Sequence, residues 1–445
     1  MPEQSCGDGA DNDCDGLTDC VDSDCDARSC GPNGERCTGG ACVCPGGEAT
    51  EQTCGDGADN DCDGLTDCGD PDCATAPACC VAAGPTENQC TDGVDNDCDG
   101  SVDHLDSDCW WDPAWGYRIK ITFDNSAQNE DLVDFPVLVV LDDATVDRQR
   151  FALGGADIRF VDADGQTVLP YEFERFNRLT SSPDYAYLWV KVPKIDAAST
   201  TDHIWLYYGN GNAPAGENPA AVWDANYRGV YHLADLVVDG WEIGTHRDST
   251  ANGAYGQQHR NGAATASGCI HRCADFDGSE DYIVLPQSAF AGMGAITLSA
   301  LARVTGEPND YPHVVSGGDQ VWELVWRANP DTWAARARVA GAIYRVASAS
   351  DSLNTTRHLA MTYDGTTFRL FVDGVLAQSM PLTGPLNGLS TEVRIGDDPV
   401  DSPREFEGYI DEVRISDVAR SPAWIAAQYR VQTRQFVSYG PEEPF

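Results

Sequence analysis

The sequence predicts a mainly β protein in which disulfide-rich, irregular repeats precede two β-sandwich domains. Residues 1–109 hold 17 of the 19 cysteines and contain no Phe, Trp, Tyr or Ile. An acidic motif recurs within this segment, whereas residues 110–445 carry all the aromatic residues in alternating patterns between turns. A chain of 445 residues is long enough for several domains.

The charge of the chain excludes some classes of function. There are 28 basic residues against 72 acidic ones, a net charge of −44, and residues 1–109 alone hold two basic and 27 acidic residues. Such a surface repels nucleic acids and anionic membranes and attracts cations. The chain has no run of about 20 apolar residues, the length that membrane insertion as a helix requires. We therefore expect neither nucleic-acid partners nor membrane insertion.

Cysteine usage indicates the compartment. Residues 1–109 lack the apolar side chains for a core, so disulfides and metal ions must stabilise them. Disulfides on this scale form in oxidising compartments, which predicts an extracellular or cell-surface protein. The first residues show no basic and apolar leader, so we expect the leader to lie upstream or export to take another route.

Three related units repeat in the acidic segment. The string C-G-D-G-A-D-N-D-C-D-G-L-T-D-C begins at Cys6 and returns at Cys54. A looser copy begins at Cys90, with His104 where the third cysteine should stand. The sequence thus predicts repeat units at 6–25, 54–73 and 90–109.

Each unit contains the pattern D-x-D-x-D-G-x-x-D-x-x-D, which is the ligand spacing of a calcium loop. Alternate carboxylates can converge on one ion, and the glycine at position 6 permits the sharp turn. The predicted metal ligands are Asp11, Asp13, Asp15, Asp19 and Asp22; Asp59, Asp61, Asp63, Asp67 and Asp70; and Asp95, Asp97, Asp99, Asp103 and Asp106. Because position 12 is Asp rather than Glu, we expect a weak affinity, roughly 10⁻⁴ to 10⁻³ M.

These units resemble thrombospondin type 3 repeats and, more closely, the metal-binding repeats named after the surface protein MopE. The second resemblance implies a copper association. Hard oxygen ligands in this number favour Ca²⁺, which is the metal we expect. Copper, held by His104 and an unpaired cysteine, is the alternative.

Most of the cysteines are candidates for disulfides, although the connectivity cannot be read from the sequence. Two local bridges are expected within Cys30, Cys37, Cys42 and Cys44, which resemble a truncated growth-factor-like module. The odd number of cysteines in this segment leaves one thiol that is free, bonded to another molecule or a metal ligand, and we expect it in the third unit. The disulfide candidates are Cys6, Cys14, Cys20, Cys25, Cys30, Cys37, Cys42, Cys44, Cys54, Cys62, Cys68, Cys73, Cys269 and Cys273.

The segment 110–215 reads as a β-sandwich. Apolar residues alternate with polar ones, and Gly, Asp, Asn and Pro separate the runs. Strands are predicted at 117–123, 137–141, 157–161, 185–192 and 203–208. The strings D-I-R-F-V-D-A-D-G, L-W-V-K-V-P and L-Y-Y-G-N resemble the family called domain of unknown function 2341. That resemblance implies an exported β domain and no activity.

The segment 225–440 carries further strand patterns. The strings D-F-D-G-S-E-D-Y, R-H-L-A-M-T-Y-D-G and G-Y-I-D-E-V-R-I, in this order, resemble the laminin-G-like, concanavalin-A-like jelly roll. Ser421 as cap and Pro422 at the first position predict one helix that runs to about Tyr429.

Function on such a fold must come from the site. The E-x-D-x-x-E string of glucanases with this fold does not occur, so we expect no enzyme activity. Relatives of the fold often hold one Ca²⁺, for which Asp277, Asp411 and Glu412 are the candidates. A local disulfide is expected between Cys269 and Cys273. Trp322 and Trp326 read as core, and Trp333 reads as an exposed residue for sugar stacking.

The sequence therefore predicts a non-enzymatic secreted or cell-surface protein with three calcium-binding repeats and a lectin-like, adhesive C-terminal domain. Its expected partners are calcium and a glycan or surface-protein ligand. One alternative is a carbohydrate-active enzyme that uses the jelly roll. The other is a copper-binding surface protein.

Overall fold

Two compact units make up the protein, residues 1–113 with Phe445 and residues 114–444. The computed structural model describes residues 2–445 except 33, 45–46, 49, 74–75, 77, 81, 88–93, 103–105, 236–244, 260–261, 265–268, 319 and 402.

The N-terminal unit has little regular structure, because aspartate side chains take up many backbone N–H groups that a helix or sheet would otherwise use. Its buried residues include a cluster of Cys6, Cys20, Cys25 and Cys37, so sulfur replaces an apolar core, as predicted. Its elements are short: η1 (Asp19–Val21), η2 (Ser23–Cys25), β1 (Arg36–Thr38), β2 (Ala41–Val43), η3 (Asp67–Gly69), η4 (Pro71–Cys73) and η6 (Ser107–Cys109).

The first sandwich packs a sheet of order β26-β3-β9-β5-β6 against a sheet of order β4-β8-β7. All five predicted strands are present, and two of them have the predicted bounds. Their inward side chains form one buried apolar cluster. The strands are β3 (Tyr117–Phe123), β4 (Leu132–Asp142), β5 (Arg159–Asp162), β6 (Val168–Leu169), β7 (Tyr171–Phe176), β8 (Asp184–Ile195), β9 (His203–Tyr208) and β26 (Val437–Pro444), with η7 (Arg148–Arg150) and η8 (Leu153–Gly155).

The jelly roll consists of two larger antiparallel sheets around a second buried cluster. One has the order β13-β14-β25-β16-β21-β22-β23, with β10 also paired to β25; the other has the order β11-β12-β15-β24-β17-β18-β19-β20. The strands of the first sheet are β10 (Tyr227–Tyr231), β13 (Gly262–Ala264), β14 (Cys273–Asp277), β16 (Ile296–Val304), β21 (Arg357–Tyr363), β22 (Thr367–Val372), β23 (Val375–Pro381) and β25 (Glu407–Ser416). Those of the second are β11 (Thr245–His246), β12 (Gly256–His259), β15 (Tyr282–Leu285), β17 (His313–Gly317), β18 (Trp322–Ala328), β19 (Asp331–Val339), β20 (Ala342–Ser350) and β24 (Val393–Ile395), and η9 (Gln287–Phe290) follows β15.

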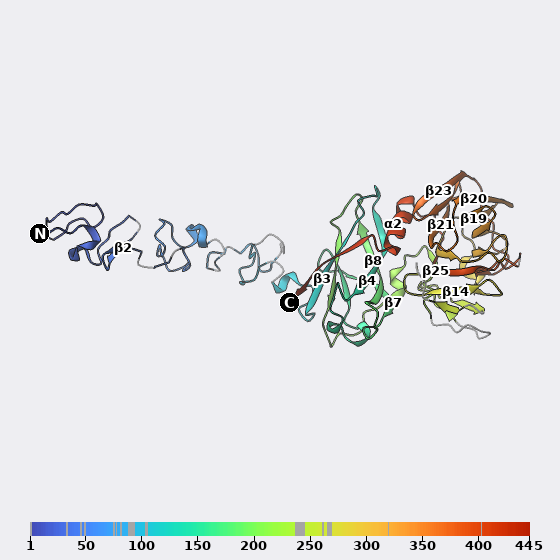
Figure 1. The fold of residues 1–445 in the computed structure, drawn as a ribbon, viewed down its shortest axis with the longest axis horizontal. Helices are drawn as coiled ribbons and strands as arrows, with labels where there is room; N and C mark the ends of the chain where they lie inside the picture. The colour runs from blue at the N-terminus through green and yellow to red at the C-terminus, as the bar shows by residue number, and fades with distance from the viewer. Residues whose placement is uncertain are drawn as a thin grey trace. The chain divides into compact units, whose positions relative to one another are not determined.

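The C-terminal segment returns to the first sandwich. Helix α2 (Pro422–Gln432) begins as predicted, since the hydroxyl of Ser421 accepts a hydrogen bond from the Trp424 N–H at 3.1 Å. The Trp424 ring lies edge-on to Phe135 at 4.7 Å, and β26 then pairs with β3 (Figure 1). The jelly roll was expected to reach residue 440, but the structure places these last elements on the first sandwich. Their aromatic side chains complete its core.

A short helix, α1 (Pro219–Val222), leads from the first sandwich into the jelly roll. Val222 and Trp223 belong to the apolar cluster of the first sandwich, and so do Leu301 and Phe371 from the jelly roll. The two sandwiches are therefore packed on each other within one compact unit. Residues from both can meet in a single site.

Candidate metal centres and a pocket between the sandwiches

The acidic loops of the repeats take the same conformation in each copy. The position-1 carboxylates of Asp11, Asp59 and Asp95 accept hydrogen bonds from the glycine N–H five residues later, at 2.9 to 3.1 Å. Those glycines have φ near +100°, a region that only glycine adopts without strain. The D-x-D-x-D-G spacing thus fixes the shape of the loop.

In the first repeat the carboxylates at positions 3 and 12 converge with a third one that the sequence analysis missed. Ligand oxygens of Asp13, Asp22 and Glu3 lie within 4.8 Å of one another, and so do those of Asp11, Asp13 and Asp15. Glu3 is buried and accepts hydrogen bonds from the N–H and side-chain amide of Asn12. Asp13 belongs to both groups, so the two carboxylate triads share one residue.

The same glutamate recurs in the other copies. Glu51 accepts from the Asn60 N–H at 2.7 Å, and Glu87 accepts from the Asn96 N–H at 2.8 Å. In all three copies this Glu stands eight residues before the first loop aspartate and three before the first cysteine of the unit. That fixed spacing was the sequence signal that could have found it.

Each repeat also leaves one buried carboxylate oxygen without a partner. Asp22, Asp70 and Asp106 at position 12 are 3 %, 3 % and 0 % exposed. One oxygen of each accepts the N–H two residues on, and Oδ2 of each has no hydrogen-bond partner. A buried anionic oxygen is costly unless a proton or a cation meets it.

The pKa values of the loop aspartates also favour a bound cation. Desolvation first, then the neighbouring carboxylates, raises the pKa of Asp13, Asp61 and Asp106 above the usual value. Repulsion between converging carboxylates is what a bound divalent ion relieves.

The remaining predicted ligands are engaged in other ways. Asp19 and Asp67 at position 9 accept hydrogen bonds from the N–H groups of Gly9 and Gly57. The position-5 residues Asp15, Asp63 and Asp99 accept from the N–H two residues on. Asp97 accepts the Asp99 N–H. Asp103 lies outside the described residues.

Disulfides link neighbouring repeats, and their pattern differs from the one expected. Of the two bridges expected among Cys30, Cys37, Cys42 and Cys44, only Cys30–Cys42 is local. The other two cysteines bond outward to the neighbouring acidic loops. The described bridges are Cys6–Cys25, Cys20–Cys37, Cys30–Cys42, Cys44–Cys62, Cys54–Cys73, Cys68–Cys79, Cys80–Cys98 and Cys269–Cys273.

Among the described cysteines the free thiol is Cys14 in the first unit, not one in the third unit as expected. The equivalent cysteines Cys62 and Cys98 each bond to a cysteine 18 residues before them. In the third unit Cys109 is disulfide-bonded. His104, on which the copper alternative depends, lies outside the described residues.

The three metal candidates of the jelly roll are not brought together. Asp277 is exposed at the end of β14, opposite Glu407 on β25 and several residues along that strand from Asp411. Asp411 and Glu412 are buried instead at the junction with the first sandwich. The Asp411 carboxylate accepts N–H bonds from Ile270 and Glu412.

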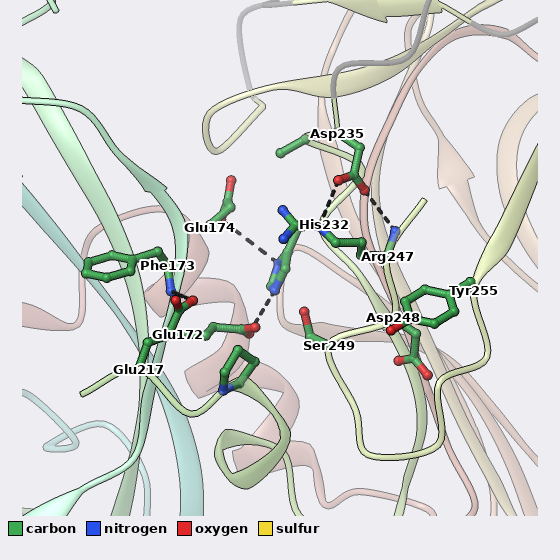
Figure 2. Close-up of a pocket in the computed structure, with 12 residues that line it drawn as sticks. Glu172, Phe173, Glu174, Glu217, His232, Asp235, Arg247, Asp248, Ser249 and Tyr255 are labelled. Carbon is green, nitrogen blue, oxygen red and sulfur yellow. Dashed lines mark hydrogen bonds and ion pairs between the residues drawn. The ribbon is translucent and has the colours of Figure 1, made fainter. Parts of the chain in front are cut away.

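A pocket of about 230 Å³ opens at this junction (Figure 2). Strand β7 contributes Glu172, Phe173 and Glu174 from the first sandwich, the connection through α1 contributes Glu217 and Pro219, and the jelly roll contributes the remaining wall. Figure 2 shows His232 between these glutamates and the pair formed by Asp235 and Arg247. The lining residues are Glu172, Phe173, Glu174, Glu217, Pro219, His232, Ala234, Asp235, Arg247, Asp248, Ser249 and Tyr255.

His232 joins carboxylates from the two sandwiches. Its Nδ1 lies 2.6 Å from Glu412 Oε1, and its Nε2 lies 2.9 Å from Glu172 Oε1. Burial opposes the charged imidazole, but Glu412 and Glu172 outweigh it and raise the pKa of His232 well above its usual value. Burial raises the pKa of Glu412, but its contacts with His232 and Arg414 outweigh this effect and lower the pKa.

Two further acids lie in this cluster. Oε2 of Glu174 is 4.0 Å from Nδ1 of His232, farther than the contacts of His232 with Glu412 and Glu172. Burial and then Glu412 raise the pKa of Glu174 to about 8 and the pKa of Asp411 well above its usual range. Trp189 donates its indole N–H to Glu174 Oε2 at 3.1 Å, whereas buried Oε1 has no partner. A pKa of about 8 leaves Glu174 mainly protonated at neutral pH, so its carboxyl group can donate as well as accept a hydrogen bond.

Two of the three tryptophans considered in the jelly roll are buried as expected, and the third is buried where exposure was expected. Trp322 and Trp326 belong to the core of the jelly roll, as predicted. Trp333 is 1 % exposed and packs edge-on to Trp326 at 5.0 Å, so its expected exposure was wrong. Its register opposite Trp326 on β18 directs both rings into the core.

Comparisons with known proteins agree with two of the resemblances. Residues 277–426 match the family described as the concanavalin A-like lectin/glucanases superfamily, and residues 154–237 match a domain of unknown function, DUF2341. No curated protein matches the chain. The C-terminal part is thus a lectin-like domain of the concanavalin A type.

Solved structures share part of this fold at low similarity. The binding domain of Paraclostridial Mosquitocidal Protein 1 is 15 % identical, with a TM-score of 0.33, over 46 % of this chain and 52 % of its own. Domain 4 of AbnA, an extracellular GH43 arabinanase from Geobacillus stearothermophilus, solved with arabinotriose, is 18 % identical, with a TM-score of 0.35, over 46 % and 98 %. The chain spans about half the length of the toxin domain that it matches.

The helices of the described residues are all too short or too polar to cross a membrane.

Proposed function

We propose that this protein is a non-enzymatic, secreted or cell-surface protein whose repeats bind one calcium ion each and whose C-terminal domain binds a ligand. The observation that carries the calcium proposal is the buried, unpartnered Oδ2 of Asp22, Asp70 and Asp106. It recurs at the same position in each repeat. A defect that arose by chance would not recur at the same position in all three repeats.

The donor set favours calcium. The first repeat offers carboxylate oxygens from the loop and from the preceding glutamate. The bridged cysteines are oxidised and offer no thiolate. Ca²⁺ takes six to eight oxygen ligands in flexible geometry, whereas copper prefers nitrogen or sulfur. Three ions would offset part of the negative charge at the points where carboxylates converge.

Equilibrium dialysis of the oxidised full chain against ⁴⁵Ca²⁺ at about 1 mM tests the proposal, because extracellular-type sites have affinities of roughly 10⁻⁴ to 10⁻³ M. The wild type should retain three ions. Asp70→Asn and Glu51→Gln should each retain two. The matched controls Asp72→Asn, at an exposed residue, and Glu48→Gln, at a half-buried one, should retain three. No retained calcium, or equal loss in the controls, would overturn it.

The junction pocket supports a second proposed function, the binding of a polyhydroxylated, sugar-like ligand. Five carboxyl groups line a cavity that is smaller than the roughly 300–1,000 Å³ of drug-sized sites. Carboxylates accept hydrogen bonds from hydroxyl groups, and the unpartnered Glu174 Oε1 faces no competing donor. The half-exposed ring of Tyr255 can stack on a sugar face.

Glycan-array binding of the full chain, paired with a reducing-sugar assay, tests this function and the absence of turnover. Tyr255→Ala should abolish binding, and Tyr344→Ala, a change elsewhere in the jelly roll, should not. Released sugar that disappears in Glu174→Gln would identify a hydrolase instead. Binding that is unaffected by Tyr255→Ala would remove the pocket from the proposal.

A further inference from the structure

A second buried cluster lies within the jelly roll, apart from the junction. His313 begins β17, Glu323 lies on β18, and Asp398 follows β24. Trp322 and Leu324 face the core of the jelly roll, so the alternation of β18 directs Glu323 to the opposite face of the sheet. All three side chains are at most 1 % exposed. The sequence analysis singled out none of them.

The orientation of the imidazole is set by the backbone. Nδ1 of His313 lies 2.7 Å from the carbonyl oxygen of Tyr311. A carbonyl only accepts hydrogen bonds, so Nδ1 carries the proton and donates it there. In the neutral imidazole, Nε2 then presents its lone pair in the opposite direction. Histidine ligands of metals are held by this type of bond to a backbone carbonyl.

Nε2 faces two carboxylates at equal distance. It lies 3.4 Å from Glu323 Oε2 and 3.4 Å from Asp398 Oδ2. Nε2 of His313 and Oε2 of Glu323 are both buried without a hydrogen-bond partner. A charged imidazole bonded to one carboxylate would lie about 2.7–2.9 Å from it.

The separation fits ligands around a common centre. Donor atoms 3.4 Å apart at the corners of a tetrahedron lie about 2.1 Å from its centre. Zinc bonds to imidazole nitrogen and carboxylate oxygen are about 2.0–2.2 Å long. We propose that His313, Glu323 and Asp398 bind one divalent transition metal of the zinc type.

Neighbouring groups hold the carboxylates in place. The hydroxyl of Ser316 lies 3.2 Å from Asp398 Oδ2 and 3.4 Å from Glu323 Oε1. The other oxygen of Asp398 accepts the N–H groups of Val400 and Asp401 at 2.7 and 2.9 Å. The metal would therefore fasten the segment after β24 to the face of the sheet.

A metal-free ion network is the competing explanation. Nη1 of Arg336 lies 3.2 Å from Glu323 Oε2. Arg336 and a protonated His313 would together neutralise the two carboxylates. This arrangement binds no metal, so metal stoichiometry separates it from the proposal.

The test uses the full chain, saturated with Ca²⁺ to occupy the acidic repeats and alkylated at Cys14 to remove its thiol. Isothermal titration with Zn²⁺ should show one site per chain, and Co²⁺ at the same site should give the visible absorption of a tetrahedral complex. His313→Gln and Asp398→Asn should each weaken Zn²⁺ binding by about 100-fold or more, beyond the effect of a second-shell change.

His203→Gln is the matched control. The His203 Nδ1 also contacts the carbonyl two residues before it, at 3.1 Å from Thr201 O, but in the other sandwich. It should bind Zn²⁺ as the wild type does. Near-ultraviolet circular dichroism shows whether each variant is folded, and Asp398→Asn keeps the side-chain volume. Absence of a one-per-chain Zn²⁺ site, or wild-type affinity in folded His313→Gln and Asp398→Asn, would overturn the proposal and leave the ion network.

Discussion

The N-terminal and C-terminal units reach a folded state by different means. In residues 2–113 the described buried residues are mainly cysteines and carboxylates, and seven bridges between described cysteines cross-link the segment. Residues 114–444 bury two large aromatic and aliphatic clusters and have the single described bridge Cys269–Cys273. Covalent and ionic cross-links can replace a core only where they constrain the unfolded chain and neutralise the charge.

Reduction of the disulfides should give the largest difference in stability between the two units. With dithiothreitol and a chelator in the full chain, residues 1–113 should unfold completely, since each native disulfide of a small domain stabilises it by about 2–5 kcal/mol. The sandwiches should keep their protection. Hydrogen exchange read by mass spectrometry reports each segment, and protection of the repeats after full reduction would contradict the comparison.

Loss of a core side chain should destabilise the C-terminal unit, residues 114–444. Leu188 is 0 % exposed at the centre of β8, so Leu188→Ala should lower the free energy of unfolding of residues 114–444 by about 2–5 kcal/mol. Leu179→Ala, at 77 % exposure, is the control and should change it little. Denaturant unfolding followed by tryptophan fluorescence measures both, because nine of the 11 tryptophans lie in residues 114–444. Equal effects of the two variants would show that β8 is not part of a packed core.

The junction acids should make the stability of the sandwiches depend on pH. The pKa of Glu174 is raised from 4.5 to about 8 on folding, so the folded state binds more protons between these values and loses stability as pH rises through them. The pKa of His232 is also raised on folding, from 6.5, so His232 adds to the loss of stability as the pH rises above 6.5.

Glu174→Gln should therefore exceed the wild type in stability by roughly 2–4 kcal/mol at pH 8 and match it near pH 4.5. Glu217→Gln, another residue of the pocket wall, is the control and should follow the wild type. Urea unfolding at several pH values measures the difference. A gap that is constant with pH would show that Glu174 ionises normally.

The smallest effect is expected at Cys14. One thiol per oxidised chain should react with a thiol reagent, and Cys14→Ser should remove the reaction without changing stability, since Cys14 is exposed and unbridged. Cys62→Ser, which breaks the bridge to Cys44, is the matched change and should expose a second thiol. A Cys14→Ser variant that still carries one reactive thiol would place the unpaired cysteine elsewhere.

Short-range patterns predicted much of this architecture. Alternation gave β3 and β9 with their observed bounds, and the Ser421-Pro422 pair gave the start of α2. The loop spacing gave the converging aspartates of the first repeat. These features depend on residues a few positions apart, for which sequence distance and spatial distance agree.

Longer-range relations were missed or misplaced. Glu3 escaped notice because it lies outside the calcium-loop pattern, although its fixed offset in three copies was visible. Trp333 was assigned to the surface from its neighbours Pro330 and Asp331, whereas its register against Trp326 buries it. Cys14 could not be recognised as unpaired until the bridges of Cys62 and Cys98 were known.

The sequence by itself determined that an acidic, cysteine-rich segment without an apolar core precedes two β-sandwiches, because composition and period act locally. Only the tertiary structure decided that His232 meets Glu412 and Glu172, or that His313 meets Glu323 and Asp398. Those residues stand far apart in the chain. Strand register and the packing of one sandwich on the other bring them together, and neither is encoded in a short window.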